Sequence, residues 1–301
     1  TTLFRSARVY GTFAVPGGET LYIGQPLAAT TTHCLTTGAT GTGKSVAAAN
    51  IALQDWAGGH AVLVIDPHGA LLEDILAGVP LAREGDVHIL DMESSQPFQF
   101  NICRVGRAEG VEKTVAYLME AIRIGEPASW DTSVGMKEVL ENGLMVALYA
   151  DEYACLTDVA SVLDPATRLT MVDKVTAVTP EAQEAVHFWQ AVFPQWNKND
   201  QKRALTAAQR RINKFLKSQA LRRTLTGSET TFDLAAAIQQ RQLILAPMPQ
   251  SMGAETKRIW SALLVREFMT VLMTLPPAKR PYTTLIVDEL KDSIGTLAEF
   301  I

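Results

Sequence analysis

The sequence predicts an α/β fold in which a mostly parallel sheet is interrupted by an all-helical insertion. Short apolar runs that end in acids or turn residues alternate with helical patterns in the outer parts of the chain, which is typical of a doubly wound sheet. The middle of the chain shows helical spacing throughout. We therefore expect residues 32–104 and 228–301 to form one α/β core, and residues 105–227 to form an all-α inserted domain.

The first segments of the chain differ in character. Residues 1–6 read like the translation of a sequencing-library adapter, and we expect them to be a non-native leader. Residues 7–31 alternate apolar and turn-forming residues, which predicts a β-rich leading segment. Residues 32–37 are predicted to form a short buried strand, and the Ala-rich residues 46–56 a helix that ends at Gly58-Gly59.

A complete phosphate-binding pattern, G-x-x-x-x-G-K-[ST], joins this strand to this helix. Its glycines let backbone N–H groups close around an anion, and the positive end of the helix dipole points at the phosphates. In this pattern Lys44 reaches the β- and γ-phosphates, and Ser45 offers a hydroxyl to Mg²⁺. A Gly/Thr-rich turn with an incidental lysine is the alternative. The expected ATP-binding residues are Gly38, Ala39, Thr40, Gly41, Thr42, Gly43, Lys44 and Ser45.

The βαβ rhythm continues after the first helix. Residues 61–65 form a continuous apolar run, as expected of a buried parallel strand, and deliver Asp66 to its carboxyl end. Residues 70–77 are predicted to form a short helix and residues 87–91 another strand. Ligands of such sheets bind at the carboxyl ends of the strands. Asp66 is therefore a candidate auxiliary residue that tunes a base or orients water, or else it caps the following helix.

The insertion is predicted from apolar residues at helical spacing within 111–122, 139–148 and 205–216. Strand patterns then resume at residues 243–247. A long amphipathic helix is expected over 254–275, followed by a strand over 284–287.

The last of these strands ends in two carboxylates, Asp288 and Glu289. Beside a phosphate-binding loop, this pattern indicates the second motif of a P-loop NTPase with a RecA-like core. Asp288 would hold the Mg²⁺ ion and its water, and Glu289 would act as the general base. The catalytic candidates are thus Lys44 and Glu289, the metal candidates are Ser45 and Asp288, and the cofactors are ATP and Mg²⁺. The alternative is a strand end with ordinary solvated carboxylates.

Charge is distributed unevenly along the chain. The net charge is −5, yet the segment from Lys198 to Arg223 holds nine Lys or Arg and one acid. Such a cluster is a solvated helix face, a subunit contact or a site for phosphates of DNA. Aromatic residues are too few there to support base stacking. The candidate DNA or subunit contacts are Lys202, Arg203, Arg210, Arg211, Lys214, Lys217, Arg222 and Arg223.

The remaining composition limits the function classes. The three cysteines are isolated from one another, which indicates a reducing compartment and neither a disulfide framework nor a zinc site. No apolar run reaches the length of about 18 residues that a membrane-spanning helix needs.

These motifs resemble the FtsK/HerA superfamily of P-loop motor ATPases, and within it the DNA-transfer coupling proteins of conjugative type IV secretion (TraD/TraG type). The resemblance covers nearly the whole chain from about residue 10. A helical domain between the two nucleotide motifs is likewise a feature of that family. The matching segments are LTTGATGTGKS (35–45), VIDPHG (64–69), LRRTLTG (221–227), TFDL (231–234), IVDE (286–289) and SIGTLAE (293–299).

The resemblance implies a homo-hexameric ring that hydrolyses ATP to move DNA toward a membrane channel. Its partners would be DNA and the proteins of a secretion channel or relaxosome, and it would work in the cytoplasm at the inner face of a bacterial cell membrane. Contact with the membrane would come through segments outside this sequence. In the family, an arginine that completes the neighbouring subunit's site follows the point where this chain stops, twelve residues after Glu289. We therefore expect a C-terminally truncated core with weak or no activity of its own.

Two other functions fit the same residues. One is a secretion-system ATPase that acts on protein during pilus or channel assembly. The other is a ring scaffold that binds nucleotide without hydrolysing it. Neither the cargo, the direction of movement nor a preference for ATP over GTP can be read from these residues.

Overall fold

The computed structural model describes residues 7–26, 29, 33–104, 107, 110–125, 130, 134–248 and 252–289. These residues fall into two compact units. The first contains the described parts of Thr1–Asp91, Asp233–Gly253 and Phe268–Ile301; the second contains those of Met92–Phe232 and Ala254–Glu267. The boundary between the units passes through one long helix, α11 (Ala254–Thr274). The sequence-based domain limits at 104/105 and 227/228 stay predictions.

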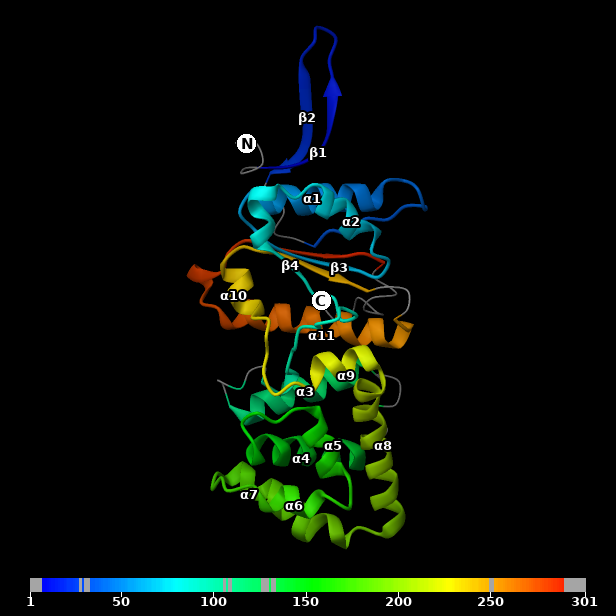
Figure 1. The fold of residues 1–301 in the computed structure, drawn as a ribbon, viewed down its shortest axis with the longest axis vertical. Coiled ribbons are helices and arrows are strands. Elements are labelled where there is room, and N and C mark those ends of the chain that lie inside the picture. The colour runs from blue at the N-terminus through cyan, green and yellow to red at the C-terminus, as the bar shows by residue number, and fades with distance from the viewer. Residues whose placement is uncertain are drawn as a thin grey trace. The chain divides into compact units, whose positions relative to one another are not determined.

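The first unit is built around a four-stranded sheet with the order β4-β5-β3-β6, in which every neighbouring pair is parallel (Figure 1). This arrangement confirms the predicted α/β class. The strands are β3 (Ala61–Asp66), β4 (Val87–Ile89), β5 (Leu243–Pro247) and β6 (Thr283–Val287). Helices α1 (Lys44–Ala57), α2 (Ala70–Ala77) and α10 (Leu234–Gln239) and the 3-10 turns η3 (Leu81–Asp86) and η9 (Pro277–Lys279) complete it.

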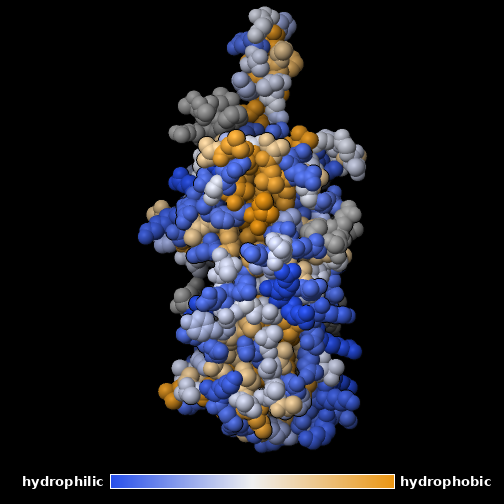
Figure 2. Space-filling view, viewed as in Figure 1, coloured by the Kyte–Doolittle hydropathy of each residue, from blue (hydrophilic) through white to orange (hydrophobic). Residues whose placement is uncertain are grey.

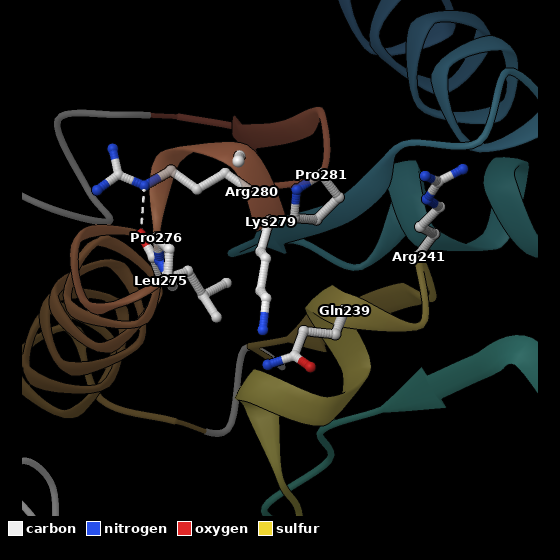
Figure 3. A pocket seen from close by; sticks show the side chains of 8 residues that line it. Gln239, Arg241, Leu275, Pro276, Lys279, Arg280 and Pro281 are labelled. Carbon is white, nitrogen blue, oxygen red and sulfur yellow. Dashed lines mark hydrogen bonds between the residues drawn. The ribbon is translucent and has the colours of Figure 1, made fainter.

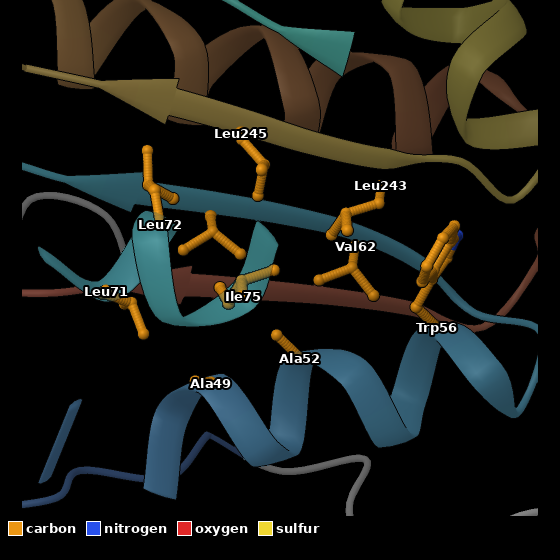
Figure 4. Packing of buried hydrophobic residues seen from close by; sticks show 10 residues of the cluster. Ala49, Ala52, Trp56, Val62, Leu71, Leu72, Ile75, Leu243 and Leu245 are labelled. Carbon is orange, nitrogen blue, oxygen red and sulfur yellow. The ribbon is translucent and has the colours of Figure 1, made fainter. Parts of the chain in front are cut away.

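The core of this unit lies between the sheet and helices α1 and α2 (Figure 4). Strand β3 is buried along its whole length, because it has neighbours on both sides and helices over it. Helix α1 contributes Ala49, Ala52 and Trp56 to the cluster. Its N-terminal end lies beside the carboxyl ends of the strands, which is where a phosphate-binding loop has to be.

The strand predicted over residues 32–37 is wrong for the part that the structure describes. Residues 33–37 have no regular secondary structure and are exposed. A parallel strand needs a hydrogen-bonded neighbour. On the outer side of β6 no strand of the described chain lies beside it, and β4 occupies the other edge. The apolar content of this segment alone therefore does not produce a strand here.

An antiparallel hairpin of the first unit precedes the sheet in the sequence (Figure 1). It pairs β1 (Ala7–Ala14) with β2 (Thr20–Pro26) and carries a bulge between Val9 and Gly11. Phe13, Tyr22 and Ile23 are among its exposed large hydrophobic side chains.

The second unit is helical in all the regular elements that the structure describes. A core of side chains from α4, α5, α8 and the aromatic turn around Trp189 holds it together. Its elements are η4 (Ile102–Arg104), α3 (Val111–Gly125), α4 (Val134–Ala150), α5 (Leu156–Leu163), α6 (Arg168–Asp173), α7 (Pro180–His187), the π-helical turn η7 (Phe188–Val192), η8 (Phe193–Gln195), α8 (Lys198–Lys217) and α9 (Gln219–Leu225). No helix among the described residues is both long and apolar enough to cross a membrane.

The cysteines give a simple test of this fold. Cys34 is exposed, whereas Cys103 and Cys155 are buried, and burial also raises the pKa of the Cys103 thiol. We expect a thiol reagent at neutral pH to modify Cys34 rapidly in the native protein, and the other two only after denaturation. Fast modification of Cys103 or Cys155 in the folded protein would contradict the packing described above.

Candidate functional site

The loop before α1 has a tightly turned, glycine-containing backbone. Gly41 and Gly43 have φ values of 82° and 84°, in the left-handed region that other residues adopt only with strain. A Cβ at Gly38 would lie 2.7 Å from Oγ1 of Thr42. The hydroxyl of Thr42 and its backbone N–H both donate to the carbonyl of Ala39, at 2.8 Å and 3.4 Å. The loop is thus closed by its own contacts.

The N-terminus of α1 is left open to a ligand. Gly43 occupies the capping position and has no side chain to accept hydrogen bonds from the first turn, and that turn contains no acidic residue. Backbone N–H groups at such a helix end are therefore free to bind an anion. Lys44 and Ser45 begin the helix and are half-buried.

Lys44 folds back onto its own loop. Its Nζ atom donates to the carbonyls of Gly38 and Ala39, at 2.9 Å and 3.0 Å. These two hydrogen bonds keep the ammonium group over the loop.

The two carboxylates of the second motif follow β6. Strands β3 and β6 pair with Ile65 opposite Val287, so Asp66 and Asp288 leave the sheet at the same edge. The backbone N–H of Asp288 donates to the carbonyl of Ile65 at 3.0 Å, which fixes the chain at this point. Glu289 is exposed, has a φ of 45°, and donates its backbone N–H to Oδ1 of Asp288 at 3.0 Å.

Asp66 is fully buried and makes helix-capping contacts. Its Oδ1 accepts from the backbone N–H of His68 at 2.8 Å, and its Oδ2 accepts from those of Leu71 and Leu72 at 2.9 Å and 3.3 Å. The helix-capping position of α2 is Gly69, which has no side chain. Of the two roles open from the sequence, the contacts favour the cap, since both carboxylate oxygens are used by backbone donors.

The cations between Lys198 and Arg223 divide into three groups. Along α8 and α9, exposed side chains include those of Lys202, Arg203, Arg210, Lys217 and Arg222. Two others are held by the second unit itself. Lys214 pairs with Glu255 at 2.7 Å, and the exposed side chain of Arg223 donates to the carbonyls of Ser94 and Ser95.

Arg211 is different from its neighbours. It is 4% exposed, donates to the carbonyl of Ala207, and lies over the ring of Trp130. A buried guanidinium cannot contact a polyanion at the surface, so Arg211 belongs with the apolar face of α8 and not with the exposed cations.

A pocket of about 480 Å³ lies elsewhere in the first unit (Figure 3). It is near the amino-terminal ends of β5 and β6, away from the phosphate-binding loop. Its cations do not converge: Arg280 donates to the carbonyls of Met273 and Leu275 at the end of α11, and Lys279 alone points toward Gln239. Cations at a helix C-terminus are explained by the helix dipole. The lining residues are Gln239, Arg241, Leu275, Pro276, Ala278, Lys279, Arg280 and Pro281.

A buried polar network that was not predicted from the sequence lies at the far end of α1. Arg8 of β1 donates to the carboxylate of Asp55, with a shortest N–O distance of 2.6 Å. Thr284 of β6 donates its hydroxyl to the same carboxylate at 2.6 Å. The signal was present in the sequence: Asp55 falls on the apolar stripe of its helix with Ala49 and Ala52.

Comparison with known proteins gives the fold. No protein-family model and no curated protein matches this chain. Solved structures of the conjugative coupling protein TrwB do match it. One, described as the plasmid coupling protein TrwB with the non-hydrolysable ATP analogue ADPNP, has a TM-score of 0.60 at 17% sequence identity and covers 86% of this chain and 57% of that one.

Two further matches are structures of TrwBdeltaN70, a bacterial conjugative coupling protein. The unbound monoclinic form has a TM-score of 0.55 at 15% identity, and covers 87% of this chain and 64% of its own. The trigonal form with sulphate has a TM-score of 0.55 at 14% identity, with coverage of 87% and 65%. The chain therefore spans about three fifths of the length of the structures it matches, and it has the fold of these conjugative coupling proteins.

Proposed function

We propose that this chain is part of an ATP-driven motor subunit that moves DNA in a conjugative or type IV secretion system. The observation that carries the proposal is the uncapped glycine loop at the N-terminus of α1, placed at the carboxyl edge of a parallel sheet on which Asp288 and Glu289 also end. The likeness to TrwB, solved with an ATP analogue, supports it.

In this proposal different residues of the chain bind the phosphates of ATP, hold Mg²⁺ and accept a proton. The loop N–H groups and Lys44 bind the β- and γ-phosphates, and the ammonium group exchanges the loop carbonyls for phosphate oxygens. A hydroxyl and a carboxylate, from Ser45 and Asp288, are the oxygen donors that Mg²⁺ prefers, so the residues present fit that ion. The ion would neutralise phosphate charge. Glu289, exposed at the same edge, would take the proton of the attacking water.

DNA contact is assigned to the exposed cations of α8 and α9. Arg203, Arg210 and Lys217 are seven residues apart, which places them on one face of the helix at intervals of about 10 Å. Figure 2 shows hydrophilic residues along the side of the molecule on which Figure 1 places α8. A row of cations without stacking aromatics binds phosphates independently of sequence.

The wider setting is proposed from the same resemblance. The subunits would assemble as a homo-hexamer and work with relaxosome or channel proteins in the cytoplasm, at the inner face of a bacterial membrane. A protein-secretion ATPase and a non-hydrolysing scaffold are the outcomes that would replace this proposal.

The test is ATP hydrolysis by the protein with and without DNA, at low and high salt, together with DNA binding. We expect Arg203→Ala and Arg210→Ala each to weaken DNA binding and to reduce the slope of log K against log salt by about 1. DNA-stimulated turnover should fall with them. The matched controls are Arg104→Ala and Lys174→Ala, exposed cations of the same unit that lie outside α8 and α9.

Each other outcome has a definite meaning. Hydrolysis that is indifferent to DNA would favour the protein-secretion ATPase and make the α8 cations a subunit contact. ATP-dependent assembly without hydrolysis would favour the scaffold. If the α8 variants and the control variants weaken DNA binding equally, then the exposed cations of α8 are not the DNA contact.

A further inference from the structure

The network of Arg8, Asp55 and Thr284 joins the two elements that carry the nucleotide motifs. Asp55 lies near the end of α1, whose other end is the phosphate-binding loop. Thr284 lies near the start of β6, whose other end leads to Asp288 and Glu289. The Oγ1 atom of Thr284 donates to Oδ2 of Asp55 at 2.6 Å, and both residues are buried.

We infer that the hydrogen bond between Asp55 and Thr284 sets the position of α1 along β6, and through it the spacing of Ser45 and Asp288. The inference rests on the proposed function, because it assigns these two oxygen donors to Mg²⁺. Asp55 and Thr284 are then positioning residues, which act on the metal site from the opposite edge of the sheet.

The geometry favours this mechanical link. Ser45 precedes Asp55 by ten residues, or about 15 Å along a rigid helix. Asp288 follows Thr284 by four residues, or about 13 Å along a strand. Helix and strand thus run in opposite directions past each other, with the polar contact at one end and the metal donors at the other. A displacement at the first end is carried to the second.

The contacts that α1 makes with the sheet in the hydrophobic cluster are apolar. Ala49, Ala52 and Trp56 of α1 pack against the sheet in the hydrophobic cluster (Figure 4), and Gln54 is hydrogen-bonded to the backbone of Val9 in β1, not to β6. Hydrogen bonds depend strongly on distance and angle, unlike apolar contacts. The bond from Thr284 to Asp55 therefore adds a directional contact between α1 and β6 to this apolar packing.

Arg8 offsets the free-energy cost of burying the carboxylate of Asp55. Its Nε and Nη2 atoms contact both oxygens of Asp55 at 2.6–3.1 Å, and Nη2 also donates to Oγ1 of Thr284 at 3.3 Å. Burial opposes the charge on Arg8, but its hydrogen bonds and attraction to Asp55 raise the pKa of the guanidinium overall. His60, 3.9 Å from Asp55, has a lowered pKa because it is buried, so Arg8 supplies the positive charge.

The decisive experiment separates metal binding from nucleotide binding. Thr284→Val keeps the shape of the side chain and removes the hydroxyl donor. We expect the Mg²⁺ concentration needed for tight binding of a fluorescent ATP analogue to rise about tenfold, the lower end of the effect of residues that hydrogen-bond directly to metal ligands. Binding of the same analogue in EDTA should stay unchanged, since the loop and Lys44 are intact. Thr284→Ser should restore the wild-type Mg²⁺ dependence.

Thr283→Val is the matched control, since it makes the same substitution one residue earlier on β6. If Thr284→Val does not fold in a thermal melt, Thr284→Ala, which leaves the pair of Arg8 and Asp55 in place, serves instead. A wild-type Mg²⁺ dependence in the Thr284 variant would overturn the inference, and so would an equal loss of binding with and without Mg²⁺. A wild-type protein that binds no nucleotide would overturn the proposed function instead.

Discussion

Glu289→Gln is expected to lower the rate of ATP hydrolysis by about 10²–10⁴-fold, the usual contribution of a positioned general base. Glutamine has nearly the same shape but cannot accept the proton of water. Glu289 is exposed and makes its contact with Asp288 through its backbone N–H, so the substitution should leave the fold intact. The affinity for ATP should therefore be kept. Steady-state turnover and binding of a fluorescent analogue, measured on the same preparation, check both expectations.

Glu229→Gln is a suitable control, because it makes the same chemical change at an exposed position in the second unit. Turnover in Glu289→Gln equal to that of the wild type would show that Glu289 is not the base. A wild type without turnover, but with nucleotide-dependent assembly, would agree with a scaffold.

Local patterns predicted most of the first unit. The apolar run before Asp66 became the buried strand β3, and residues 70–77 and 243–247 match α2 and β5 as predicted. These elements are specified by their own residues: a continuous apolar stretch is stable only in the middle of a sheet, and an acid or glycine marks its end. Gly41 and Gly43 of the loop needed no tertiary information either, since glycine adopts left-handed backbone without strain.

Contacts between distant residues could not be predicted in the same way. A strand over 33–37 would need a neighbour in the sheet, and apolar content does not supply one. Arg211 belongs to a run of cations, yet it is buried with its guanidinium over the ring of Trp130, because its position on α8 faces the core. The contact of Asp55 with Thr284 joins residues 229 positions apart. A polar residue on an apolar stripe indicates a buried side chain with a hydrogen-bond partner, but the pattern does not identify that partner.

The sequence left two roles open for Asp66, a helix cap and a catalytic auxiliary residue, and substitutions at this position distinguish them. Asp66→Ala leaves the backbone N–H groups of Leu71 and Leu72 buried without an acceptor. At about 1–3 kcal/mol for each unsatisfied group, the free energy of unfolding should fall by roughly 2–6 kcal/mol. Urea denaturation measures this loss. Asp74→Ala, at an exposed position of the same helix, should stay within about 0.5 kcal/mol of the wild type.

Asp66→Asn distinguishes a cap from a catalytic auxiliary. The amide of asparagine keeps one acceptor oxygen but turns an N–H donor toward a backbone N–H. If Asp66 is a cap, the variant should therefore be less stable, while the turnover per folded molecule should change little. A stable variant with greatly reduced turnover would instead assign the carboxylate to the chemistry at the neighbouring Asp288 and Glu289. Because both oxygens of Asp66 already accept backbone hydrogen bonds, we expect the first result.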